Sequence, residues 1–148
     1  MIWISGDVHN EIDFRKIYEK NRELKDTLTR DDYFIFTGDF GIPWGGSNKP
    51  TDDYLLKWIR ENCKATILFL DGNHDNFDLL YSFPIIEKFG SKVRQLEENL
   101  FHLMRGHIYT IEEKTFFCFG GAQSTDKHRR IEGISWWPQE MPSVVEED

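Results

Sequence analysis

The fold is decided by the stretch TILFLDGNHD, residues 66–75. Its opening residues are β-branched, aromatic or aliphatic and do not alternate with polar side chains, which is typical of a strand buried on both faces of a largely parallel sheet. The apolar run ends just before Gly72, and side chains with oxygen and nitrogen donors follow it directly. The stretch therefore predicts an inner strand that ends in a polar corner.

Two earlier stretches repeat this pattern. IWISGDVH occupies residues 2–9 and YFIFTGD occupies residues 33–39, so in both an apolar run leads into Gly-Asp. Apolar residues at helical spacing lie between the runs, over about residues 11–28 and again after Thr51, which we expect to cap the second helix. The apolar stripe of that second helix is formed by Tyr54, Leu55, Trp58 and Ile59.

Strands that alternate with helices indicate right-handed βαβ units. In such sheets ligands bind beyond the carboxyl ends of the strands, which is where all the polar corners fall. Later short apolar runs over 93–96, 100–104, 107–111 and 115–119 favour antiparallel hairpins, as a second sheet or as an extension of the first. We therefore predict a single α/β domain over residues 1–148.

The bulk composition is that of an ordinary folded domain. Hydrophobic residues make up 39% and charged residues 30% of the chain, which argues against wholesale disorder. The formal net charge of −8 argues against a broad nucleic-acid-binding surface, so a phosphate substrate would need locally placed cations. Cys63 and Cys118 have no metal-binding spacing and fit a reducing cytoplasm. No apolar stretch approaches the roughly 18 residues of a membrane span.

The corners carry the donors of a two-metal hydrolytic site. Two divalent cations about 4 Å apart can clamp a phosphoester, activate a water molecule and stabilise charge on the phosphoryl oxygens. Such a site needs a carboxylate that gives an oxygen to each metal, with mixed oxygen and imidazole donors around it. Asp7, His9, Asp39 and Asn73 supply this mixture.

The motif order resembles that of the calcineurin-like metallophosphoesterase superfamily, which is Gly-Asp-x-His, then Gly-Asp, then Gly-Asn-His-Asp/Glu. This chain has Gly6-Asp7-Val8-His9, Gly38-Asp39 and Gly72-Asn73-His74-Asp75 in that order. The resemblance implies a β-sandwich flanked by helices that hydrolyses a phosphomonoester or phosphodiester. It implies that Asp7 and His9 bind the first metal, that Asp39 bridges both metals and that Asn73 binds the second. Two divalent ions are implied, with Mn favoured over Fe, Zn or Mg.

The same resemblance gives roles to residues beyond the metal ligands. His74 is similar to the family's histidine that protonates the leaving group or stabilises the transition state, and Asp75 is expected to orient it. His128 and Arg129 lie in a basic stretch of loop and are candidates for contacting the substrate phosphate, the alternative being a solvated loop. The stretch Trp136-Trp137-Pro138 is interpreted either as a lid or as a plug of the core.

The sequence departs from the family pattern at the histidines that the family has later in its domain. Gly106-His107 is followed by Tyr109 in place of a second histidine, so we interpret His107 as structural. The second metal then keeps only Asp39 and Asn73, which predicts a weak second site. A capping-box pattern of Ser143 and Glu146 begins a helix at the end of the sequence. We therefore expect the C-terminal portion of the family's domain to be missing.

Two other interpretations stay open. One is a catalytically incomplete remnant of the family, in which a second copy covers apolar surface or a bare sheet edge, so that a homodimer is expected. The other is a Rossmann-type nucleotide binder, which is disfavoured because no glycine-rich phosphate loop follows the first strand. We expect a cytoplasmic protein that acts on a phosphoester without membrane association, and a nucleic-acid partner is not indicated.

Overall fold

The computed structural model describes residues 1–9, 13–14, 16 and 26–143. Most of the helix expected over 11–28, and Glu146 of the expected capping box, lie outside the described residues. The elements in chain order are β1 (Ile2–Ser5), β2 (Tyr33–Thr37), η1 (Gly46–Asn48), α3 (Lys49–Asn62), β3 (Thr66–Leu70), α4 (Phe77–Ser82), β4 (Ile85–Lys88), β5 (Ser91–Glu97), β6 (Leu100–Leu103), β7 (His107–Ile111), β8 (Lys114–Cys118), η2 (Lys127–Arg129) and η3 (Pro138–Glu140).

Six strands form one sheet in the order β1-β2-β3-β6-β5-β4. The strands β1, β2, β3 and β6 run parallel, whereas β5 and β4 are added antiparallel at one side. A separate two-stranded antiparallel sheet consists of β7 and β8. The predicted α/β class is confirmed, and the later strands supply both an extension of the first sheet and a second sheet. The sequence did not predict β4, because its side chains are mostly exposed and its short apolar pair, Ile85 and Ile86, comes directly after Pro84.

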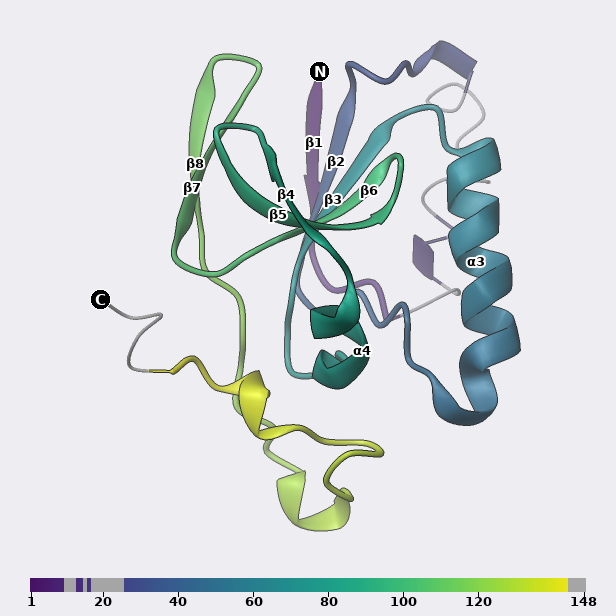
Figure 1. The fold of residues 1–148 in the computed structure, drawn as a ribbon, viewed down its shortest axis with the longest axis vertical. Coiled ribbons are helices and arrows are strands. Elements are labelled where there is room, and N and C mark those ends of the chain that lie inside the picture. The colour runs from purple at the N-terminus through teal and green to yellow at the C-terminus, as the bar shows by residue number, and fades with distance from the viewer. Residues whose placement is uncertain (10–12, 15, 17–25, 144–148) are drawn as a thin grey trace.

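The main sheet is covered on both faces. Figure 1 shows α3 on one side of it and the β7–β8 hairpin on the other. Successive residues of β2 alternate between the two apolar clusters: Phe34 and Phe36 pack with residues of α3, whereas Ile35 packs with residues of β7. Burial on both faces is therefore confirmed for β2. It is wrong for β1, where Ile4 is 62% exposed, because β1 is the edge strand of the sheet.

Helix α3 begins earlier than the sequence indicated. Its N-cap position is Asn48 and its first turn contains Pro50, which suits that position because its ring presets the helical backbone and the missing N–H has no partner there. The expected cap at Thr51 is therefore wrong, and so is the place of Tyr54 in the apolar stripe, since that side chain is 52% exposed. With 14 residues, α3 is the longest described helix, and no described helix has the length and apolarity to cross a membrane.

After β8 the chain crosses the carboxyl ends of the parallel strands. This stretch, residues 119–143, is called the returning segment below, and Figure 1 shows it beyond the lower ends of β1, β2 and β3. Its regular structure consists of the short turns η2 and η3. Trp136 and Trp137 are 8% and 3% exposed, which favours the plug over the lid.

Candidate metal centre

The ends of β1 and β2 bring three of the predicted ligands together. Atoms able to bind a metal in Asp7, His9 and Asp39 all lie within 4.8 Å of one another. The His9 Nε2 atom is 2.8 Å from Asp7 Oδ1 and 3.9 Å from Asp39 Oδ2. Two carboxylates and an imidazole at this spacing are a donor set that suits a divalent transition metal. The cluster is open to solvent on the Asp7 and His9 side, where both side chains are exposed.

The backbone at these corners is unusual for side chains of this kind. His9 has φ +40° and Asp39 has φ +46°, both in the left-handed region that residues other than glycine seldom adopt. The two corners are joined directly, because the His9 N–H donates to the Asp39 carbonyl oxygen at 3.0 Å. Backbone strain of this kind concentrates at functional sites, where the surrounding structure holds it in place.

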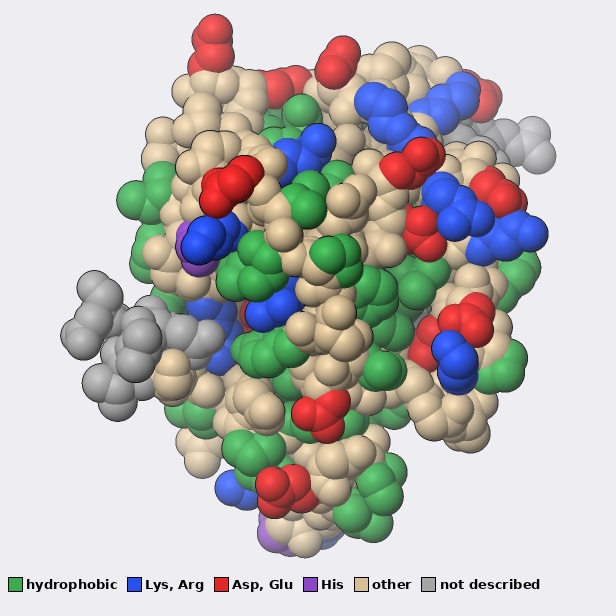
Figure 2. All heavy atoms as spheres, viewed as in Figure 1, with side chains coloured by type: hydrophobic (Ala, Val, Ile, Leu, Met, Phe, Trp, Pro, Cys, Tyr) green, Lys and Arg blue, Asp and Glu red, His purple; other side chains and the backbone are tan. Residues whose placement is uncertain are grey.

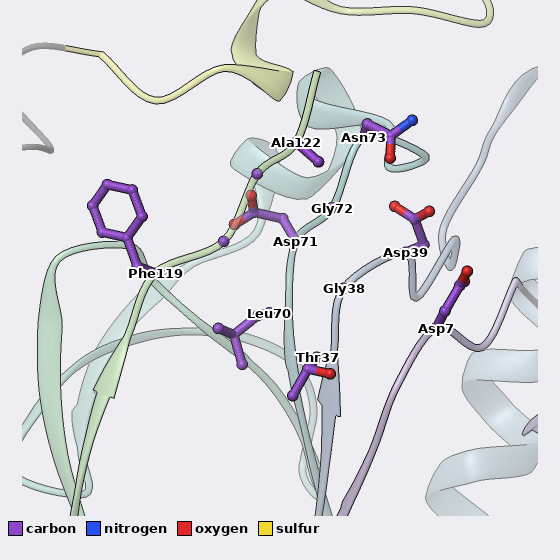
Figure 3. Close-up of a pocket in the computed structure, with 12 residues that line it drawn as sticks. Asp7, Thr37, Gly38, Asp39, Leu70, Asp71, Gly72, Asn73, Phe119 and Ala122 are labelled. Atoms are coloured by element: carbon purple, nitrogen blue, oxygen red, sulfur yellow. The ribbon is translucent and has the colours of Figure 1, made fainter. Parts of the chain in front are cut away.

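Asn73, at the end of β3, completes the row. Figure 3 shows Asp7, Asp39 and Asn73 at three adjacent strand ends, with the amide oxygen of Asn73 turned toward Asp39. The amide nitrogen of Asn73 donates to Ser124 Oγ at 3.0 Å, which leaves the oxygen available as a ligand. The row borders a hollow of about 290 Å³ whose far wall is the start of the returning segment.

The corners of β2 and β3 are pressed against each other. A Cβ atom at Gly72 would lie 1.9 Å from Asp39 Oδ1 and 2.5 Å from the Asp39 backbone nitrogen, which no side chain tolerates. The neighbouring corner needs glycine for a different reason, since Gly38 has φ +114°. The glycines before these ligands therefore serve a close approach in one case and a turn in the other.

His74 and Asp75 follow Asn73 in the chain and bond to the β2 corner. The His74 backbone N–H donates to Asp39 Oδ1 at 2.9 Å, and the His74 ring meets the His9 ring edge-on at 5.2 Å between centroids. Burial and the nearby positive charge of Arg130 lower the pKa of His74. The carboxylate of Asp75 accepts hydrogen bonds from the backbone N–H groups of Gly41 and Gly72. Asp75 thus ties the β2 and β3 corners together, and burial raises its pKa to about 7.

A buried ionic cluster anchors the returning segment, and no motif in the sequence indicates it. The Asp71 carboxylate receives His102 Nε2 at 2.8 Å and Arg105 Nε at 2.7 Å, all on side chains that are at most 2% exposed. Burial opposes ionisation of Asp71, but the hydrogen bonds and charges of His102 and Arg105 prevail and hold its pKa below the ordinary value. Arg105 also donates to the backbone carbonyl oxygen of Gln139 at 2.9 Å. His102 is therefore part of the scaffold of the site.

A second buried carboxylate acts inside the returning segment. Glu140 is 1% exposed and accepts hydrogen bonds from both the backbone N–H and the hydroxyl of Ser124. Burial opposes ionisation of Glu140, but the hydrogen bonds from Ser124 help to hold its pKa below the ordinary value. Glu140, Ser124 and Asn73 therefore form a continuous polar chain that ends at a predicted metal ligand.

The predicted substrate-binding residues lie on η2. His128 and Arg129 are both exposed there. The next residue contacts the centre itself: Arg130 places a terminal guanidinium nitrogen 2.6 Å from His74 Nε2. Elsewhere, His107 bonds to Ser91 at 2.7 Å in the hairpin region, which agrees with its structural interpretation. The Cys118 thiol in β8 is buried, and burial raises the pKa of Cys118 to about 11.

Parallel strand ends that converge on a carboxylate and imidazole cluster give an α/β protein a candidate metal centre of the kind that hydrolases use. A family model described as calcineurin-like phosphoesterase matches residues 1–146. The chain therefore belongs to the calcineurin-like phosphoesterase family, whose members are phosphoester hydrolases that use divalent metals. No curated protein and no solved structure matches the chain. The resemblance seen in the motifs is thereby confirmed.

Proposed function

We propose that this chain hydrolyses phosphoesters, as a phosphatase or phosphodiesterase, at a centre that holds two divalent ions, with Mn favoured. The observation that carries the proposal is the cluster of Asp7, His9 and Asp39, whose donor atoms lie within 4.8 Å of one another. Mixed carboxylate and imidazole donors suit Mn, Fe and Zn, whereas Mg prefers oxygen donors alone. The predicted cytoplasmic location plays no part in this argument and stays a prediction.

The ligand set divides between two ions. Asp7, His9 and Asp39 would hold the first, and Asp39 and Asn73 would hold the second. Asp39 suits the bridging position, because its Oδ2 atom faces His9 at 3.9 Å while its Oδ1 atom lies at the β3 corner, where it accepts the His74 N–H. When bound, such ions polarise a phosphoryl oxygen and make water a nucleophile at neutral pH.

The protein's own side chains then bind and orient the substrate. His74 lines a hollow of about 200 Å³ together with His9 and Trp44, so a phosphoester leaving group in that hollow meets the His74 ring. We assign His74 a catalytic role there. Asp75 supports it through the backbone of the β2 and β3 corners, and contact of His128 and Arg129 with the substrate phosphate stays a prediction.

The runner-up is a catalytically incomplete member of the family. Among the described residues, the second ion would have only two protein ligands, Asp39 and Asn73, where a metal of this type takes about four to six donors. The two candidates differ in metal stoichiometry as well as in turnover. An incomplete centre binds one ion firmly and releases the second on dialysis.

The decisive experiment measures Mn²⁺ binding and hydrolysis together. An aryl phosphate and a bis-aryl phosphate are offered to the full chain with and without Mn²⁺, beside Asp39→Ala and the control Asp53→Ala, whose exposed side chain pairs with Lys49 on α3. We expect Mn-dependent turnover in the parent chain and in Asp53→Ala, and a loss of about a hundredfold or more in Asp39→Ala. Turnover in the parent no higher than in Asp39→Ala would exclude the enzyme for this chain.

The expectation of a homodimer is based on apolar side chains that are exposed at two places on the surface. Ile4 on β1 is 62% exposed, and Ile108 and Phe117 on the β7–β8 hairpin are 57% and 66% exposed. Large apolar side chains gathered on a surface mark contact sites in many proteins. Sedimentation velocity across a concentration series tests this, and a single monomeric species at all concentrations would remove the dimer.

A further inference from the structure

We propose that Arg130 binds a phosphoryl oxygen of the substrate beside His74; this inference rests on the proposed function. A substrate phosphate carries negative charge, and so does this protein, with a formal net charge of −8. Figure 2 shows Lys and Arg side chains interspersed with Asp and Glu over the face it presents, not gathered by sign. Attraction of the phosphate therefore depends on cations at the site itself, which are bound metal ions or nearby Lys and Arg side chains.

Arg130 is such a cation, and it touches the centre. Its NH2 atom lies 2.6 Å from His74 Nε2. The His74 ring in turn packs edge-on against the His9 ring, with 5.2 Å between the ring centroids, so only the His74 side chain separates Arg130 from His9. The residue comes from the returning segment, 56 positions along the chain from His74, so the fold brings it there.

Hydrogen bonds hold the Arg130 guanidinium in place without occupying all of its N–H groups. Its Nε atom donates to Asp126 Oδ1 at 2.8 Å and its NH1 atom donates to the Ser135 carbonyl oxygen at 3.2 Å. A guanidinium has about five N–H groups in a fixed fork, and these contacts with His74, Asp126 and Ser135 use three of them. No described residue accepts a hydrogen bond from the remaining N–H groups, so they can meet an anion on a side chain that is 12% exposed.

The chemistry of the fork matches a phosphoryl group. Arginine places paired N–H donors at the spacing of two oxygens on one phosphorus atom, and such charge-assisted hydrogen bonds are roughly twice as strong as neutral ones. A phosphoester held on one side by ions bound at the Asp7, His9 and Asp39 cluster, and on the other by Arg130, would have its phosphorus beside the His74 ring. The proposal thus names a phosphate-binding residue on the returning segment.

The experiment measures binding of inorganic phosphate to the Mn²⁺-loaded full chain by calorimetry. Arg130→Gln removes the fork, and Arg60→Gln is the matched control, because Arg60 also pairs with a carboxylate but does so near the end of α3 away from the corners. We expect Arg130→Gln to weaken phosphate binding about tenfold or more and Arg60→Gln less than about twofold, with Mn²⁺ binding unchanged in both. Phosphate binding by Arg130→Gln within about twofold of the parent overturns the proposal.

A purely structural role for Arg130 makes a different prediction. Asp126→Ala removes the acceptor at Nε but keeps the guanidinium, so under our proposal it weakens phosphate binding less than Arg130→Gln does. Equal losses in the two variants would mean that Arg130 only supports its loop. If Arg130→Gln does not fold, the parent chain decides: phosphate should protect Arg130 from phenylglyoxal, read by peptide mass mapping, and absence of protection overturns the proposal.

The outcome separates this inference from the proposed function. Phosphate binding that depends on Arg130 without any hydrolysis would leave the inference standing and remove the enzyme. Hydrolysis that survives Arg130→Gln unchanged would do the reverse. A Mn²⁺-loaded chain that neither binds phosphate nor hydrolyses an ester contradicts both.

Discussion

The centre is built by two regions that hold their residues in opposite ways. The corners after β1, β2 and β3 carry Asp7, Asp39 and Asn73 within three residues of a strand end, and the sheet pairing places them. The returning segment has no strand of its own and is attached mostly through side chains, together with a hydrogen bond from the Gly121 N–H to the Asp71 carbonyl oxygen. One site therefore depends both on a ladder of backbone hydrogen bonds and on a few side-chain anchors.

The two regions should differ in how strongly a single mutation disturbs their structure. Strand pairing is shared among many residues, so one substitution in β2 leaves the corners near their places. The returning segment depends on individual groups such as Arg105, Ser124 and Trp137, each with its own partner at the corners or next to them. Substitutions in these groups should therefore reveal how much of the centre the segment supports.

The largest effect is expected at the Asp71 cluster. Arg105→Met keeps much of the side-chain volume but leaves the carboxylate of Asp71 buried with only His102 as its side-chain partner among the described residues. Breaking one partner out of a buried ionic cluster lowers the free energy of unfolding by about 3–5 kcal/mol. Urea unfolding measures the change, and the returning segment should also become the first site of cleavage in limited proteolysis.

Arg60→Met serves as the control for that experiment. In the parent chain the Arg60 guanidinium pairs with Glu97 at the surface, and the Arg60 side chain is 41% exposed. We therefore expect the free energy of unfolding to change by no more than about 0.5 kcal/mol. If Arg105→Met unfolds at the same urea concentration as the control, the segment is attached by something other than the Asp71 cluster.

An intermediate effect is expected at Ser124. Ser124→Ala removes the acceptor that fixes the Asn73 amide, so the amide can rotate and its oxygen no longer faces Asp39 in a fixed orientation. Losing a residue that orients a metal ligand typically weakens metal binding about 10- to 100-fold. Titration with Mn²⁺ should show this loss for the weaker of the two ions, with the first ion unaffected.

Ser124→Thr and Ser82→Ala complete the Ser124 experiment. Threonine keeps the hydroxyl and should restore Mn²⁺ binding, whereas Ser82 donates to the Leu79 carbonyl on α4 and its loss should not matter for metal. Equal weakening by Ser124→Ala and Ser82→Ala would show that the polar chain from Glu140 does not orient Asn73.

The smallest effect is expected at Trp137. Its indole N–H donates to Asp78 Oδ2 at 2.8 Å, and its ring meets Trp44 edge-on. Trp137→Phe keeps an aromatic ring but loses the hydrogen bond, which should lower the free energy of unfolding by about 1 kcal/mol. Trp3→Phe is the counterpart, because the buried Trp3 indole nitrogen has no hydrogen-bond partner among the described residues, and a larger loss there than at Trp137 would contradict the assignment.

The corners could be predicted because a short stretch of sequence determines the structure of each one. A strand pattern followed by Gly-Asp places the ligand by itself, and parallel pairing brings the strand ends together, as at Asp39 and Asn73. The returning segment was not predictable in the same way, since Ser124 lies 51 positions from Asn73 and no motif links the two. The basic stretch drew attention to His128 and Arg129, yet only the turn at η2 decides that Arg130 is the one to meet His74.

Other differences have equally physical causes. Thr51 is a good cap by residue type, but Pro50 one position earlier fits only the first turn, so the helix had to begin before it. The parallel pairing of β6 with β3 was also not predicted from the sequence, because a short apolar run has the same pattern whichever strand it pairs with.

The tight packing at Gly72 fixes more than a turn. With room for no Cβ between the β3 corner and Asp39, the separation of the two ligand-bearing backbones is set by atoms in direct contact. The contact therefore sets a lower limit on this separation: if Asp39 and Asn73 hold a metal, they would have to reach a smaller ion by rotating about their side-chain bonds, because the strands cannot move closer together. An ion too small to be reached by that rotation would be held less tightly by the pair.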